Sequence, residues 1–178
     1  MIEKNQSETG RVNFSHPANR AILAYLGDAV RLQRSVSVMK DRASCPPGKV
    51  KDPYLTLGAD PELLERLWDD LGSILPIDCR WVVFGTPVLV HPASGVIFAF
   101  GGGTHTYAFR LPQRERASAL AAGAVTVHQY PAYPELNIEA SVLDLSAIGE
   151  EWVFGGWHTG EEEWCYAAFS HARELAAS

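Results

Sequence analysis

The sequence predicts an α+β fold: a single domain with a mostly antiparallel sheet of four to six strands and helices packed on it. Three observations support this prediction. Short runs of Val, Ile and aromatic residues separated by turn residues fill 79–110, a pattern typical of an antiparallel meander. Apolar residues recur at helical spacing after Asp60, and they do so again after Gly160 near the C-terminus.

Residues 1–14 are mostly polar and are expected to form a flexible N-terminus, so the domain is predicted to span 15–178. A chain of 178 residues can bury roughly 70% of its unfolded surface, so it needs no metal or disulfide to fold. The first helix is predicted over 20–32, with Ser15 or Asn19 as its N-cap.

The clearest predicted helix follows Asp60, which suits an N-cap and precedes a proline at the first helical position. Its apolar stripe should cover one face of the sheet, and Gly72 is well placed to end it. A loop is predicted before it, over 44–53, because the Cys-Pro-Pro-Gly run there cannot continue a helix. The stripe consists of Leu63, Leu64, Leu67, Trp68 and Leu71.

Turn residues divide the meander into its strands. Gly85 and Thr86 are predicted to form a tight hairpin turn, and a looser turn over 91–95 should leave His91 at the surface. The glycines at 101–103 should form a third turn or a bulge. The elements expected beyond the meander are a helix over 112–122, strands over 124–130, 136–143 and 152–154, and a final helix over 160–177 with Thr159 and Glu162 as its capping box.

Composition places the chain among ordinary globular proteins, with 47% hydrophobic and 20% charged residues. The longest apolar runs reach only about half a membrane span, and no secretory signal is visible, so we expect a cytoplasmic protein with no membrane contact. Cys45, Cys79 and Cys165 are too few and too far apart for a disulfide framework and are expected to pack as small hydrophobes. No cofactor is predicted. No metal site is predicted either, because paired His or Cys ligands at tight spacing are missing.

The net charge of −6 is unevenly distributed. From residue 135 to the C-terminus, one basic residue, Arg173, stands against nine acidic residues, whereas the first 134 residues carry a slight excess of bases. An acidic region of this kind attracts a basic partner and repels nucleic acid, which we do not expect as a ligand. A solvated surface without a partner explains the same charges.

Two tryptophans in this acidic region make the leading functional hypothesis a non-catalytic protein-binding module, such as an adaptor or an immunity-like protein. Trp152 and Trp157 flank a glycine-bearing stretch beside acidic residues, and tryptophan supplies a large contact area at a protein interface. A tryptophan packed under a turn fits the same pattern. The candidate binding residues for a partner with a basic surface are Glu150, Glu151, Trp152, Trp157, Glu161 and Glu162.

The alternative hypothesis is an enzyme or small-ligand protein with a pocket at the turn between Gly101 and Thr106. Thr104 and His105 are the polar groups expected to face a ligand there, and either His105 or His128 would act as the acid–base group. No residue is assigned a catalytic role, because no nucleophile motif accompanies these histidines. A third alternative, a structural subunit of a larger assembly, would leave a broad apolar patch uncovered.

Overall fold

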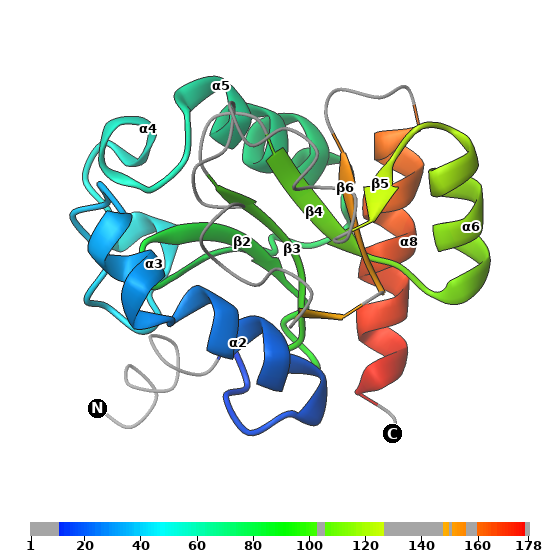
Figure 1. Ribbon diagram of the computed structural model, residues 1–178, viewed down its shortest axis with the longest axis horizontal. Helices are drawn as coiled ribbons and strands as arrows, with labels where there is room; N and C mark the ends of the chain where they lie inside the picture. The colour runs from blue at the N-terminus through cyan, green and yellow to red at the C-terminus, as the bar shows by residue number, and fades with distance from the viewer. Residues whose placement is uncertain (1–10, 103–105, 127–147, 150, 156–159, 177–178) are drawn as a thin grey trace.

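The protein, described here from a computed structural model, forms one six-stranded antiparallel sheet with helices on both faces (Figure 1). The structure describes residues 11–102, 106–126, 148–149, 151–155 and 160–176. Neighbouring strands follow the order β1-β2-β3-β4-β6-β5. The predicted single α+β domain with an antiparallel sheet is therefore confirmed.

The first four strands form the predicted meander, each antiparallel to the one before it. The turn between β1 and β2 lies one residue earlier than predicted, at Phe84 and Gly85, which have φ angles of 49° and 75°. Residues 136–143, predicted as a strand, lie outside the described residues. The strands are β1 (Arg80–Val83), β2 (Thr86–Val90), β3 (Ile97–Gly102), β4 (Thr106–Arg110), β5 (Val125–Thr126) and β6 (Trp152–Gly155).

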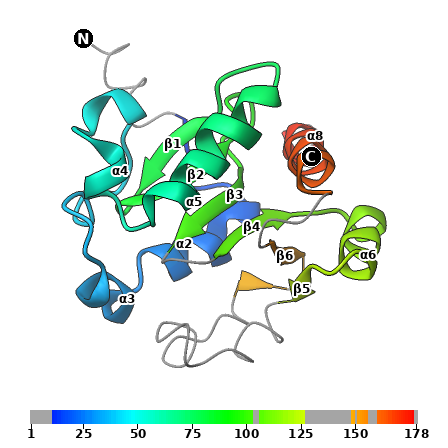
Figure 2. The same cartoon turned by 90° about the horizontal axis from the view of Figure 1, so that it is seen from above.

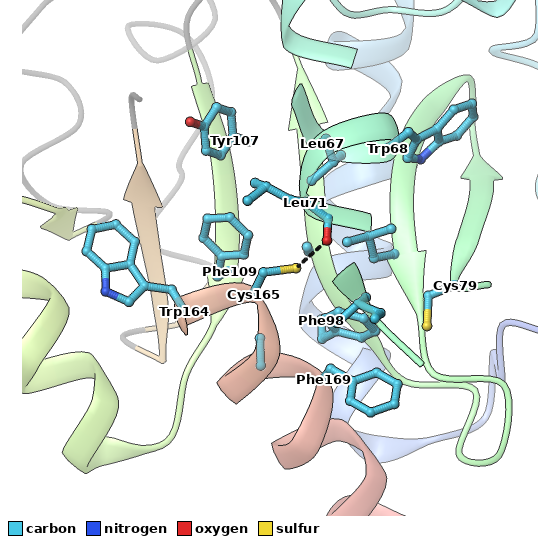
Figure 3. Packing of buried hydrophobic residues seen from close by; sticks show 14 of the residues in the cluster. Leu67, Trp68, Leu71, Cys79, Phe98, Tyr107, Phe109, Trp164, Cys165 and Phe169 are labelled. Atoms are coloured by element: carbon cyan, nitrogen blue, oxygen red, sulfur yellow. Dashed lines mark hydrogen bonds between the residues drawn. The ribbon is translucent and has the colours of Figure 1, made fainter. Parts of the chain in front are cut away.

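The helix predicted after Asp60 covers one face of the sheet. It begins as α5 (Pro61–Leu64), continues as a π-helix, η3 (Glu65–Leu71), and ends in a 3-10 turn, η4 (Gly72–Ile74). The Asp60 carboxylate caps it by accepting a hydrogen bond from the Glu62 backbone N–H at 3.0 Å. All five residues of the predicted stripe are buried in the main core. Figure 3 shows Leu67, Trp68 and Leu71 among them.

Two more helices lie on this same face, α6 (Gln113–Ala121) and α8 (Glu161–Leu175). The apolar side of α8 enters the core with Trp164, Cys165 and Phe169, and the Cys165 thiol lies 3.8 Å from the Leu71 carbonyl oxygen (Figure 3). Gly160 occupies the N-cap position of α8 and Thr159 lies outside the described residues, so the predicted capping box is not described.

The opposite face is covered by α2 (Arg20–Leu26), which follows a short 3-10 turn, η1 (Pro17–Asn19) (Figure 2). The prediction of a single helix over 20–32 was wrong, because the chain breaks at Gly27 and starts again as α3 (Ala29–Arg34). The Asp28 carboxylate caps the new helix by accepting hydrogen bonds from the backbone N–H groups of Val30 and Arg31. A Cβ at Gly27 would lie 2.9 Å from the Phe84 ring, so this position favours glycine.

The predicted loop over 44–53 protects the edge of the sheet beside β1. Cys45 and Val82 exchange two backbone hydrogen bonds of 3.0 Å, which pair the loop with the edge strand at one point. Two short helical turns follow, η2 (Pro47–Lys49) and α4 (Pro53–Thr56).

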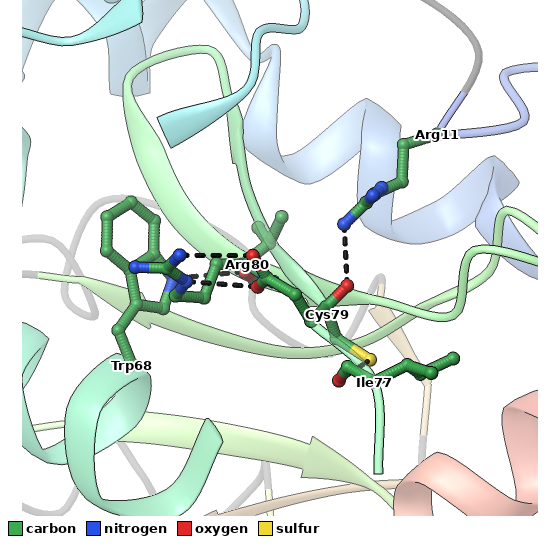
Figure 4. Close-up of polar contacts among 7 residues, drawn as sticks. Arg11, Trp68, Ile77, Cys79 and Arg80 are labelled. Carbon is green, nitrogen blue, oxygen red and sulfur yellow. Dashed lines mark hydrogen bonds and ion pairs between the residues drawn. The ribbon is translucent and has the colours of Figure 1, made fainter. Parts of the chain in front are cut away.

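Residues 11–14, assigned by the sequence to a flexible N-terminus, pack against the domain. The Arg11 guanidinium donates a 2.6 Å hydrogen bond to the Asp78 carbonyl (Figure 4) and lies 5.0 Å from the Trp81 ring centroid. Val12 is buried, and the Asn13 backbone N–H donates to the Gly95 carbonyl at 2.9 Å. Arg11, Val12 and Asn13 therefore contact the rest of the domain.

The three cysteines are buried and unbridged, as expected for small hydrophobes. Burial raises the pKa of the Cys79 and Cys165 thiols to about 12, so both are protonated at neutral pH. Within the described residues, no helix has the length and hydrophobicity needed to cross a membrane.

Candidate functional site

The outward face of α8 is acidic and carries one exposed aromatic ring. Glu162, Glu163 and Glu174 are exposed on this face, and Tyr166 is 52% exposed. The helical repeat explains the arrangement: apolar residues spaced three and four apart turn toward the sheet, and the residues between them turn outward.

A groove of about 710 Å³ lies along this face, lined by residues of α8, of the start of α6 and of the 3-10 turn η4. The ribbon views show α6 beside α8 (Figures 1 and 2). Four glutamates line it, and Ile74 and Tyr166 add apolar surface. None of the described residues that line the groove is a lysine or an arginine. The four glutamates are Glu115 from α6 and Glu162, Glu163 and Glu174 from α8.

Of the predicted binding residues that the structure describes, only Glu162 lines this groove. Glu151 is half-buried and forms a 3.4 Å ion pair with Arg110. Trp152 and Glu161 are fully buried, so neither side chain lies on the exposed surface of the protein. Trp152 is the first residue of β6 and packs at 5.2 Å from the Phe100 ring.

Glu161 faces inward because it precedes Trp164 and Cys165 by three and four residues, on the same side of α8. Its carboxylate lies 4.0 Å from the Arg66 guanidinium. Burial lowers the pKa of Arg66, but a hydrogen bond to Tyr107 and nearby negative charges more than offset this, so its pKa lies above the ordinary value. The negative charge of Glu161 therefore helps to stabilise the positive charge of Arg66.

The other predicted site residues lie outside the described residues: Glu150, Trp157, Thr104, His105 and His128. The alternative pocket at the 101–106 turn therefore stays a prediction. Gly101, which was predicted to belong to that turn, lies in β3, and a Cβ there would lie 2.7 Å from a Leu63 methyl group. Glycine here lets α5 pack closely on β3.

The sequence reasoning missed Glu115, Glu163, Tyr166 and Glu174, although part of the signal was available. The predicted helix over 160–177, with its apolar stripe assigned, already placed Tyr166 and Glu174 on the outward side. The approach of α6 to α8 could not be found in this way, because it depends on how two separate helices pack on the sheet.

A second exposed surface lies away from the groove, on the segment before Met39 and on α4 (Figure 1). Val36, Val38 and Leu55 are between 70% and 86% exposed. The Val38 backbone N–H donates a 2.9 Å hydrogen bond to the Thr56 carbonyl, which holds the two segments together.

The expectation that His91 lies at the surface was wrong, since its ring is buried and stacks 4.8 Å from the Phe169 ring. His91 Nδ1 accepts a 3.1 Å hydrogen bond from the Ala93 backbone N–H. Burial, with a smaller contribution from the positive charge of Arg173, lowers the pKa of His91 below its ordinary 6.5.

Replacing His91 with asparagine is expected to remove a pH-dependent part of the stability. Below pH 6.5 the unfolded chain protonates this histidine more readily than the folded protein, so wild-type stability falls as the pH decreases. Asparagine can accept the same hydrogen bond and does not titrate. Urea unfolding between pH 7.5 and pH 5 should give a flatter profile for His91→Asn, and parallel profiles would contradict the assignment.

Among the described residues, no three His, Cys, Asp or Glu side chains come close enough to hold a metal ion. Comparison of the chain with protein-family models, with curated proteins and with solved structures found no match. Assignment of function therefore depends on the geometry of the groove.

Proposed function

We propose that the protein is a non-catalytic binding module that captures a basic segment of a partner protein in the groove between α6 and α8. The observation that supports this proposal is the lining of the groove, with four glutamates contributed by two helices and no basic residue among its described members apart from His171. Clustered like charges repel one another in the free protein, and a basic partner relieves that repulsion.

The size and chemistry of the groove suit a peptide segment. Exposed Tyr166 can pack its ring against apolar parts of the segment and hydrogen-bond through its hydroxyl, which is how tyrosine acts at interfaces. Ile74 adds apolar contact on the η4 side. Lysine and arginine side chains combine an apolar stem with a cationic head, so they match a groove that offers both surfaces.

The test uses a fluorescein-labelled twelve-residue peptide of alternating lysine and leucine, with fluorescence anisotropy as the measurement. We expect saturable binding that weakens as salt is raised. The double variant Glu163→Lys and Glu174→Lys should weaken binding by about 30-fold, because it replaces two attractive charges with two repulsive ones. A peptide with glutamate in place of lysine should not bind.

A matched control reverses Asp41 and Glu65, two exposed acids outside the groove, and changes the net charge of the protein by the same amount. It should keep most of the affinity. Tyr166→Ala should weaken binding by about tenfold, as expected for an aromatic anchor, whereas Val38→Ser on the second exposed surface should not. An equal loss in both charge-reversal variants would show only general electrostatic attraction and would contradict the groove as the binding site.

A further inference from the structure

Arg110 and Trp152 form a buried polar pair on the face of the sheet opposite the groove. They are direct partners in the register between β4 and β6. Arg110 is only 1% exposed, and its guanidinium carbon lies 4.9 Å from the centroid of the Trp152 ring. This cation–π contact holds the guanidinium group against the indole ring.

The hydrogen-bonding capacity of this pair is mostly unused. Arg110 Nη1 faces the Glu151 carboxylate at 3.4 Å. Arg110 Nε and Nη2 and Trp152 Nε1 are buried, and no acceptor in the described part of the chain lies within hydrogen-bond distance of them. Three donor nitrogens are therefore enclosed in the protein without a matching oxygen from the described residues.

The position of the unused donors on Arg110 is informative. Nε and Nη2 point from the same edge of the guanidinium plane, and that edge binds both oxygens of a carboxylate or phosphate group. Glu151 does not use it, because its carboxylate approaches Nη1 and is 42% exposed. Buried donors in native proteins are almost always paired, so an empty two-donor edge calls for an acceptor.

The charge of the site agrees with this conclusion. Burial lowers the pKa of Arg110, and the Glu151 charge offsets only part of this effect. Arginine stays protonated in proteins even so, which leaves a poorly compensated positive charge in a medium of low dielectric constant. A neutral ligand would satisfy the donors and leave that charge, whereas an oxyanion would satisfy both.

From these contacts we infer that Arg110 and Trp152 form a binding site for a small oxyanion, a carboxylate or phosphate group, held by the Nε–Nη2 edge of the arginine and the indole N–H. The site is separate from the proposed peptide groove, which lies on the other side of the sheet. Because Arg110 is almost fully buried, a ligand must enter during a local opening of the protein, and binding should be slower than diffusion allows.

The test follows the indole N–H and arginine Nε–H signals by ¹H–¹⁵N NMR while acetate or inorganic phosphate is added at constant ionic strength. We expect the Trp152 and Arg110 signals to shift saturably with one of these anions and much less with chloride. The anion with the stronger effect identifies the ligand class as carboxylate or phosphate. Absence of a saturable shift with both anions would overturn the inference.

Three variants make the result specific. Glu151→Gln should bind the anion at least threefold more tightly, because a competing negative charge is removed. Trp152→Phe keeps an aromatic ring without the N–H and should bind about threefold more weakly through loss of one donor. Arg110→Lys should bind at least tenfold more weakly. Unchanged affinity in Glu151→Gln, a partly exposed position that folding should tolerate, would contradict the site even if Arg110→Lys fails to fold.

Discussion

Replacing Glu161 with alanine is expected to lower the free energy of unfolding by about 2–3 kcal/mol, whereas the same change at Glu162 should alter it by less than about 0.5 kcal/mol. The two residues are neighbours in the first turn of α8, yet Glu161 is fully buried and Glu162 is exposed. Loss of the buried carboxylate would remove a negative charge 4.0 Å from the Arg66 guanidinium. Arg66 retains some exposure to water, so the cost should lie below that of a fully buried pair.

Urea unfolding of both variants measures this difference, and peptide anisotropy separates stability from function. Glu162→Ala should weaken peptide binding with little change in stability, because Glu162 lines the groove. Glu161→Ala should destabilise the protein but bind the peptide normally under conditions where it remains folded. Equal stability changes at the two positions would mean that Glu161 is not buried in solution.

The parts of the fold that the sequence predicted are those set by local periodicity. The repeat from Leu63 to Leu71 and the alternation within the meander each determine which side chains face inward, whatever packs against them. The same logic could have placed Glu161 correctly, since it shares the spacing of Trp164 and Cys165. The burial of Glu161 was not predicted because a charged side chain normally lies at the surface. A carboxylate can nevertheless be buried when it pairs with a cation such as Arg66.

Other features depend on contacts between distant segments and leave no local pattern. The groove requires α6 and η4 to pack beside α8, and the buried Arg110 edge requires β4 to pair with β6. The break between α2 and α3 depends both on a local sequence signal and on a contact with a distant segment. Asp28 is a good N-cap, so the sequence contained the signal, but the close contact between Gly27 and Phe84 could not be predicted from the chain alone.

Gly85→Ala is expected to be strongly destabilising, lowering the free energy of unfolding by about 3 kcal/mol or more. Gly85 has a φ of 75°, in the left-handed region that favours glycine. A Cβ there would lie 2.3 Å from the Ser37 hydroxyl oxygen and 2.9 Å from the Lys40 backbone nitrogen. The left-handed backbone alone costs about 1–2 kcal/mol, and displacing a backbone atom adds at least as much.

Two control glycines separate these contributions in the same urea experiment. Gly149 has a φ of 98°, but a Cβ there would have no described atom within 4 Å, so Gly149→Ala should cost only about 1–2 kcal/mol. Gly48 has open space and no left-handed φ, so Gly48→Ala should be neutral or slightly stabilising. A cost at Gly85 no larger than at Gly149 would mean that Ser37 and Lys40 move aside. The 35–40 segment would then be free to shift, and the apolar surface that it presents with α4 would not have a fixed shape.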